Sequence, residues 1–106
     1  MKLTIKQGDT RHAIRAALKT VEGTPVDLSS ASVRFKMSQR FGTIALDREA
    51  TIEPDGTVHY VFNDGETDVS GFYKAEFLVT YADAREETFP HDGTIEIHIK
   101  NRIGGV

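Results

Sequence analysis

Apolar and polar residues alternate along most of this chain, and turn residues separate the alternating runs. Near the start, for example, Leu3 and Ile5 are interleaved with Lys2, Thr4 and Lys6. A period of two is typical of a β-strand that has one face in a core and the other in water. The pattern recurs in six runs, which cover residues 2–6, 32–38, 44–53, 57–63, 73–81 and 94–100.

Turn sequences support this interpretation. Glu53–Gly56, Asn63–Gly65 and His91–Gly93 each end in glycine, which accepts positive φ, and each contains Asp or Asn, which can bond the local backbone. Their spacing is typical of a β-sandwich, and a seventh strand would complete a Greek-key arrangement. We therefore expect an all-β fold: a single immunoglobulin-like β-sandwich of about seven antiparallel strands over residues 1–100, followed by a short flexible C-terminal tail over residues 101–106.

Residues 9–22 are compatible with two structures. As a helix, the segment would place apolar residues at helical spacing, with Asp9 or Thr10 as a cap and Gly23 at the end. As a strand, it would place Ile14, Ala16 and Leu18 inward, with Arg15, Ala17 and Lys19 outward. A sandwich needs a partner for the strand at residues 2–7, and tertiary context often overrides weak local propensity. We therefore expect a strand, with the helix as the alternative.

Composition excludes several classes of protein. The chain has 106 residues, of which 39% are hydrophobic, as expected for one soluble globular domain. Cysteine is absent, which excludes disulfides, thiolate zinc sites and thiol nucleophiles and fits folding in a reducing cytosol. No apolar run approaches the roughly 20 residues of a membrane span, and the N-terminus lacks the apolar core of a signal peptide. We expect no contact with a membrane.

The net charge of −3 and the pI near 5.8 disfavour a nucleic-acid-binding protein with a broad basic face. The charge is unevenly divided. Residues 1–53 contain 9 Lys or Arg and 6 Asp or Glu, a balance of +3, whereas residues 54–106 contain 4 and 10, a balance of −6. Either strands of the two halves interleave in space, or the molecule has a basic side and an acidic side suited to head-to-tail contacts.

The candidate metal motifs are incomplete. Asp64, Glu66 and Asp68 have a spacing that can direct oxygen atoms to Ca²⁺, but Val69 and Ala75 stand where an EF-hand loop requires Gly and Glu. The four histidines lack the spacing of metal ligands; they are His12, His59, His91 and His98. We expect a polar connecting loop and no metal ion or other cofactor.

The sequence also contains no recognisable catalytic group. It has no phosphate-binding loop and no nucleophile elbow. Glu86 and Glu87 are adjacent, so along a strand they would point to opposite faces and could not act together on one substrate. We therefore expect no catalytic, cofactor-binding or metal-binding residues, and a protein that is not an enzyme.

Aromatic residues suggest two further features. Tyr73, at the start of the strongest alternating run, is either a tyrosine corner, whose hydroxyl donates a hydrogen bond to upstream backbone, or a core aromatic residue with a satisfied hydroxyl. A carbohydrate-binding module would instead show an exposed aromatic platform. Most aromatic residues fall on the expected inward faces, which leaves Phe41, Phe72 and Phe89 as candidates for such a platform.

Three stretches carry a family resemblance. They are residues 5–10 (Ile-Lys-Gln-Gly-Asp-Thr), 23–37 (Gly-Thr-Pro-Val-Asp-Leu-Ser-Ser-Ala-Ser-Val-Arg-Phe-Lys-Met), and 71–77 (Gly-Phe-Tyr-Lys-Ala-Glu-Phe) running on to 87–90 (Glu-Thr-Phe-Pro). Together they resemble the small immunoglobulin-like proteins of tailed bacteriophages and prophages, which are similar to the N-terminal domain of the phage baseplate upper protein. The resemblance covers roughly residues 3–100, and its motifs are turns and core positions.

This resemblance implies a function. It implies a β-sandwich, with a strand at residues 13–19, that is a non-enzymatic structural part of the virion and is located in the tail or baseplate. The implied partners are other virion proteins and copies of the chain itself in a symmetric assembly, without nucleic acid. Head decoration or head–tail joining is one alternative. A host-encoded module that binds carbohydrate or protein is another, of a different class.

Overall fold

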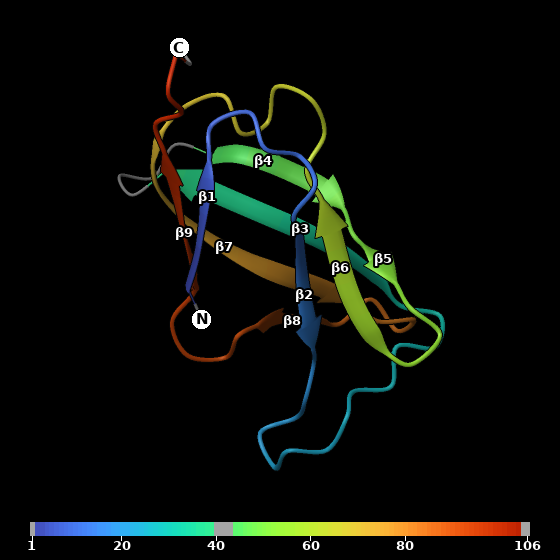
Figure 1. Ribbon diagram of the computed structural model, residues 1–106. Coiled ribbons are helices and arrows are strands. Elements are labelled where there is room, and N and C mark those ends of the chain that lie inside the picture. The colour runs from blue at the N-terminus through green and yellow to red at the C-terminus, as the bar shows by residue number, and fades with distance from the viewer. Residues whose placement is uncertain (1, 40–43, 105–106) are drawn as a thin grey trace.

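Two β-sheets packed face to face form the molecule (Figure 1). The structure is a computed structural model that describes residues 2–39 and 44–104. These residues form nine strands and no helix. The strands are β1 (Lys2–Lys6), β2 (Ala13–Ala17), β3 (Ser32–Gln39), β4 (Ile44–Glu49), β5 (Thr51–Ile52), β6 (Thr57–Val61), β7 (Gly71–Thr80), β8 (Glu86–Phe89) and β9 (Ile95–Lys100). Within the described residues no helix could therefore cross a membrane.

The two sheets differ in size. The larger has the order β1-β9-β7-β3-β4, and β8 also pairs with β7. This is possible because β7 pairs with β9 through residues 71–75 and with β8 through residues 77–80. The smaller sheet has the order β2-β6-β5. The predicted all-β architecture is confirmed.

The first strand pairs differently from the expectation. β1 runs parallel to β9, with Ile5 opposite Ile99, so one pair of the sandwich is not antiparallel. Residues 13–17 do form the expected strand, but they pair with β6 in the other sheet and not with residues 2–7. The strand at residues 2–7 thus finds its partner at the far end of the chain, and Ile14 and Leu18 point into the core as predicted.

The long run at residues 44–53 is divided between the two sheets. β4 pairs with β3 in the larger sheet and β5 pairs with β6 in the smaller one. Ala50, between them, is buried and donates its N–H to the carbonyl of Val33 at 2.8 Å. A small residue at this point allows the chain to pass from one sheet to the other without a large side chain that would have to be buried.

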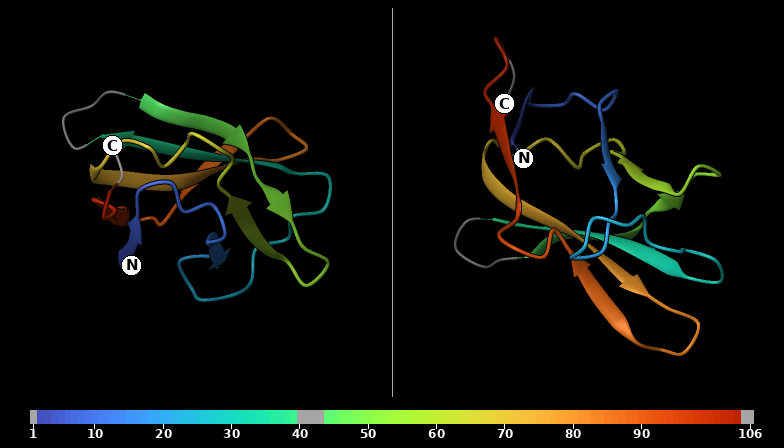
Figure 2. Two further views of the ribbon diagram at one scale, coloured as in Figure 1. Left: turned by 45° about the horizontal axis from the view of Figure 1, so that its top comes forward. Right: turned by 90° about the horizontal axis from the view of Figure 1, so that it is seen from below.

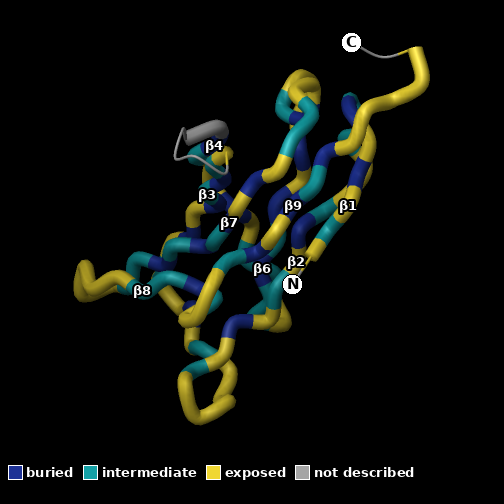
Figure 3. Tube along the Cα trace, turned by 90° about the vertical axis from the view of Figure 1, so that its left-hand side faces the viewer, coloured by how far each residue is buried: buried dark blue, intermediate teal, exposed yellow. Residues whose placement is uncertain are grey.

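The core lies between the inward faces, where the alternating pattern placed it. Phe35 of the larger sheet meets Tyr60 of β6 and Phe62 just after it, and Phe77 packs beside Phe35. The rings of Phe35 and Tyr60 stack with centroids 4.7 Å apart. Figure 3 shows buried and exposed positions alternating along β7 and β9. Burial of aliphatic and aromatic side chains from both sheets stabilises the fold.

The uneven charge does not divide the molecule into two sides. Strands of the basic half pair with strands of the acidic half: β1 with β9, β3 with β7, and β2 with β6. Opposite charges therefore meet across strands, as where Lys36 lies opposite Glu76 and where Lys2 Nζ lies 3.7 Å from Glu96 Oε2. Interleaving is the interpretation that the topology supports.

Polar side chains join distant parts of the chain at one end of the sandwich. Gln7 donates its side-chain N–H to the carbonyl of Asp68 at 2.9 Å and accepts the N–H of Arg102. The buried hydroxyl of Thr67 donates to the carbonyl of Asp9 at 2.9 Å, and Arg102 Nη2 pairs with Asp9 Oδ1 at 3.0 Å. Arg102, assigned from the sequence to the flexible tail, is thus bonded to the domain. We call this group, Gln7, Asp9, Thr67, Asp68 and Arg102, the polar end.

Candidate functional site

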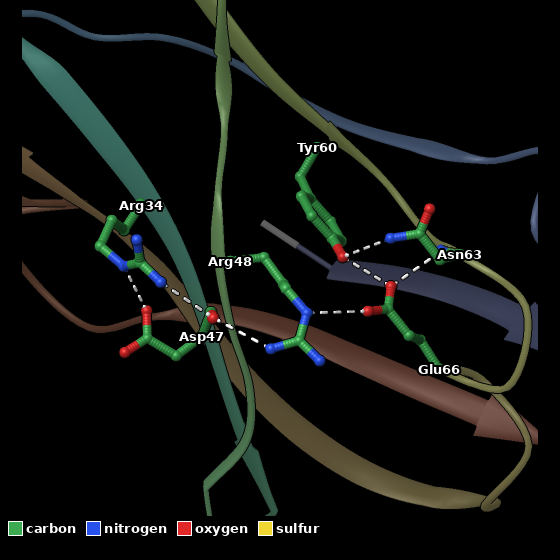
Figure 4. A network of polar contacts seen from close by, with 6 residues as sticks. All are labelled: Arg34, Asp47, Arg48, Tyr60, Asn63 and Glu66. Carbon is green, nitrogen blue, oxygen red and sulfur yellow. Dashed lines mark hydrogen bonds and ion pairs between the residues drawn. The ribbon is translucent and has the colours of Figure 1, made fainter.

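A chain of polar contacts connects the two sheets near β4 (Figure 4). Glu66, in the loop after β6, accepts the Tyr60 hydroxyl at 2.5 Å and the N–H of Asn63 at 2.8 Å. Its other oxygen lies 3.4 Å from Arg48 Nε on β4. Burial and the Glu66 carboxylate together raise the pKa of Tyr60, so the phenol remains a hydrogen-bond donor. This network fixes the loop to the larger sheet.

These contacts show how the carboxylates of the candidate calcium loop are used in the structure. Of its three carboxylates, Glu66 is directed inward to Tyr60 and Arg48. In the described part of the chain, no three side chains of the metal-ligating types come together in a way that could hold an ion. The loop serves as a polar connection between β6 and β7.

The four histidines lie in four different places. His12 Nε2 is 3.8 Å from Asp9, His59 Nδ1 is 2.6 Å from Glu53 Oε1, and His91 Nε2 is 2.7 Å from Glu87 Oε2. His59 Nδ1 and Glu53 Oε1 are within ion-pair distance, but they are not aligned as a hydrogen bond. His98 stacks on Phe72, with centroids 4.0 Å apart.

Glu86 and Glu87 are separated as the sequence predicted. Glu86 is exposed, whereas Glu87 points to the other side of β8, where it accepts the Tyr81 hydroxyl at 2.7 Å and meets His91. The Tyr81 hydrogen bond is the main cause that lowers the pKa of Glu87, and burial raises the pKa of Tyr81 to about 12. This arrangement holds the β8 edge; it does not direct two carboxylates at one position.

Tyr73 satisfies both interpretations that the sequence left open. Its ring is buried at the start of β7, and its hydroxyl donates to the carbonyl of Val69, four residues upstream, at 2.6 Å. This is the geometry of a tyrosine corner, which in immunoglobulin-like sandwiches marks the start of strand F.

The three candidates for an aromatic platform have different fates. Phe89 is only 5% exposed and packs in the core, so its assignment as a platform candidate was wrong. The alternation of the neighbouring runs did not indicate that it is buried. Phe41 lies outside the described residues. Phe72 is 56% exposed on the outer face of the larger sheet, stacked on His98.

Charged side chains surround this stacked pair. A shallow hollow of about 420 Å³ extends over β1, β9 and β7, and its lining includes Phe72 and His98 together with Lys2, Lys74 and Glu96. We call it the outer hollow. An aromatic surface beside charged groups could take a polar ligand with one apolar face.

Sheet edges are the other candidate surfaces. β1, β4 and the short β8 are edge strands of the larger sheet, and β2 and β5 are those of the smaller one. β1 carries Lys2 and Lys6, and β4 carries Asp47, Arg48 and Glu49. Charges on an edge strand limit uncontrolled pairing with other chains. β2 has one charged residue, Arg15.

Comparisons with known proteins bear on the fold. No protein-family model matches the chain, and no curated protein matches it in sequence. Among solved structures, the chain is similar to the crystal structure of CopC from Methylosinus trichosporium OB3b, with a TM-score of 0.56 and 14% identity over 95% of this chain and 85% of that one. At this identity the likeness concerns the fold alone, and it shows that the chain is an immunoglobulin-like β-sandwich.

Proposed function

We propose that the chain is a non-enzymatic structural protein of a tailed-phage or prophage-derived virion, part of the tail or baseplate, and that it works through protein–protein contacts. The observation that carries the proposal is the resemblance of three stretches to phage sandwich proteins. In the fold, the second and third stretches contain most of β3, β7 and β8, and β7 pairs with both β3 and β8 in the larger sheet. The resemblance therefore concerns residues that pack together, not scattered positions.

The surface of the molecule is consistent with this role. A sandwich has open edges and loops that a neighbouring subunit can extend or cover. Among the described residues, several carboxylates and histidines are engaged in separate structural pairs, such as Glu87 with Tyr81 and His59 with Glu53. A particle that repeats the chain would combine several small contacts, each weak in isolation.

Mass spectrometry of purified particles from the phage or prophage that encodes the chain tests the proposal. We expect the protein in intact particles, in several copies for each particle. Head decoration or head–tail joining would give the same result, and immunogold labelling of the particles would separate those sites from the tail. Detection in the lysate but never in particles would overturn the proposal.

One observation favours a second candidate function, a module that binds carbohydrate. Phe72 and His98 form a stacked aromatic pair beside Lys2, Lys74 and Glu96 in the outer hollow. A glycan array would test it with the wild type, a Phe72→Ala variant, and a Val61→Ala variant in which an exposed apolar residue of the smaller sheet is removed. Binding that Phe72→Ala alone abolishes would support this function, whereas binding to no glycan would leave the structural role.

A further inference from the structure

The smaller sheet is one strand narrower than the fold would allow. Constant-type immunoglobulin sandwiches place strands A, B, E and D in one sheet and C, F and G in the other. The tyrosine corner at Tyr73 identifies β7 as F, so its neighbours β3 and β9 are C and G. The smaller sheet, β2-β6-β5, then corresponds to B, E and D. In the described residues, the place of strand A beside β2 has no strand, because β1 pairs with β9 in the other sheet.

The backbone at this place is open on one side. β2 pairs with β6 along residues 13–17, and the described residues form no other strand pair with it. None of the described backbone hydrogen bonds outside the strands involves residues 13–17. A strand with free N–H and C=O groups along one edge is a template for another strand. The chemistry of the edge therefore selects an extended polypeptide as its ligand.

A hollow beside β2 is suited to the side chains of such a strand. It measures about 290 Å³ and lies at the seam between the sheets. Its apolar lining includes Ala16 of β2, Leu18 just after β2, Phe89 at the end of β8, Pro90 just after it and Ile95 of β9; Lys19 and His91 also line it. An apolar cavity of about 150 Å³ holds one benzene molecule, so this seam hollow has room for about two ring-sized side chains.

The charges at the edge indicate which polar side chains the ligand should carry. Arg15 and Lys19 are exposed and lie on the side of the segment opposite Ile14 and Leu18. Arg11, just before β2, is also exposed. Cross-strand pairs of opposite charge stabilise a sheet, and like charges directly opposite destabilise it. A segment that alternates apolar and acidic residues would place the apolar ones in the seam hollow and the acidic ones beside these cations.

We propose that an extended segment of a different virion protein adds to the edge of β2 as the fourth strand of the smaller sheet. Main-chain hydrogen bonds to residues 13–17 hold the segment, and alternate apolar side chains enter the seam hollow. The inference rests on the proposed function, which supplies the neighbour.

A second copy of this chain is a poorer occupant. If two β2 strands paired antiparallel about Arg15, the two guanidinium groups would lie directly opposite each other. In addition, Ile14 and Leu18 of each copy are already buried in that copy's own core, so neither strand could supply side chains to the other's seam hollow. A foreign strand has neither restriction.

Hydrogen–deuterium exchange tests the occupied edge. Amide exchange of residues 13–17 is compared between the purified protein and intact particles, with β1 as a reference edge in the same spectra. We expect exchange at residues 13–17 to slow at least tenfold in particles, and more than exchange in β1. Unchanged exchange at residues 13–17, in particles that do contain the protein, would overturn this inference and leave the proposed function intact. Absence of the protein from particles would overturn both.

Cross-linking identifies the occupant. A photo-reactive benzoylphenylalanine in place of Lys19 should cross-link to a different virion protein in particles; cross-links to a second copy of this chain would overturn the choice of occupant.

Arg15→Glu should reduce incorporation into particles at least tenfold. Its matched control, Lys100→Glu, makes the same charge change at an exposed position of β9 and should not. Equal incorporation of the two variants would overturn the role of charge at this edge.

Discussion

The two ends of the space between the sheets are closed in different ways. At the polar end, Gln7, Thr67 and Arg102 bring together loops that are 58 to 95 residues apart in the sequence. At the opposite end, β2 comes near the segment after β8 (Figure 1). The seam hollow lies between them, and Phe89 and Pro90 are among its lining residues. The right-hand view of Figure 2, from below, shows β9 (red) and β2 (blue) apart from each other; they belong to different sheets.

The two ends therefore have different roles: the polar end stabilises the chain itself, whereas the seam end is available to a partner. At the polar end, the hydrogen bonds of the buried Gln7 and Thr67 satisfy polar groups that would otherwise be buried without a partner, so this end is complete within the chain. The seam hollow is bordered mostly by apolar side chains, together with Lys19 and His91, and by the free edge of β2. In the isolated protein, water can satisfy the backbone groups of this edge. A partner can therefore add to this end without breaking contacts that the fold needs.

The largest expected effect comes from the core that both ends share. Phe77 is fully buried in the middle of β7, and truncation of a buried phenylalanine typically costs about 3–5 kcal/mol. Phe77→Ala should lower the free energy of unfolding in urea by that amount. Lys74→Ala, on the outer face of the same strand, should change it by less than about 0.5 kcal/mol. Equal losses would show that the faces of β7 are assigned wrongly.

At the polar end we expect an intermediate effect. Gln7→Leu retains the side-chain bulk but leaves the carbonyl of Asp68 and the N–H of Arg102 without their partner, at a cost of about 1–3 kcal/mol. At the seam, Ala17→Ser changes an exposed position of β2 and should stay within about 0.5 kcal/mol. Both values come from urea unfolding of the purified protein. A larger loss for Ala17→Ser than for Gln7→Leu would reverse the comparison of the two ends.

The same contrast explains what the sequence could predict. Inward positions such as Val33, Phe35 and Phe77 were predictable, because a period of two fixes the face of each strand. The partner of β1 was not, since parallel pairing with β9 depends on contacts between the two ends of the chain. The division of β4 from β5 at Ala50 was also missed, because alternation continues through the point where the chain changes sheets. Phe89 was assigned to the surface because β8 is short and its alternating pattern is not distinct.

For the candidate sites too, local properties of a strand could be predicted from the sequence, whereas properties that depend on strand pairing could not. The sequence correctly separated Glu86 from Glu87, which is a local property of a strand. It offered the hydroxyl bond of Tyr73 as one of two alternatives, on the basis of a known corner motif. The seam hollow and the free edge of β2 could not be predicted, because they depend on which strands share a sheet. The sequence pattern marked residues 13–17 as a strand but did not indicate that one of its edges would be open.

A smaller effect is expected from the acid–phenol pair near the seam. The pKa of Glu87 is lowered from its ordinary value of 4.5, mainly by the Tyr81 hydroxyl and further by His91. A lowered pKa means that the folded state favours the carboxylate, so this stabilisation is present above pH 4.5 and is lost as the pH falls through the lowered value. The Glu87 side chain is 36% exposed, so solvent screening keeps the effect below about 1 kcal/mol.

Urea unfolding at pH 7 and pH 3 measures this contribution. The Glu87→Gln variant cannot titrate at this position, so it should lose less stability than the wild type between the two pH values. Tyr81→Phe should behave similarly, because it removes the main cause of the lowered pKa. At the polar end, Asp9 also has a lowered pKa, caused first by Arg102 and unaffected by these substitutions, so it serves as a common background. Identical losses in all three proteins would contradict the assignment of this pH dependence to Glu87.

The smallest expected effect is that of calcium on the loop next to the polar end. Asp64, Glu66 and Asp68 have a spacing that could serve Ca²⁺, but Glu66 is held by Tyr60 and Arg48 and would have to break both contacts to bind an ion. A ligand that binds the folded state raises the melting temperature by mass action. Millimolar Ca²⁺ and a chelator should therefore give the same melting temperature, measured by calorimetry. A reproducible rise of several degrees with Ca²⁺ would show that Glu66 exchanges its internal partners for an ion, and that this loop is less firmly fixed than its hydrogen bonds indicate.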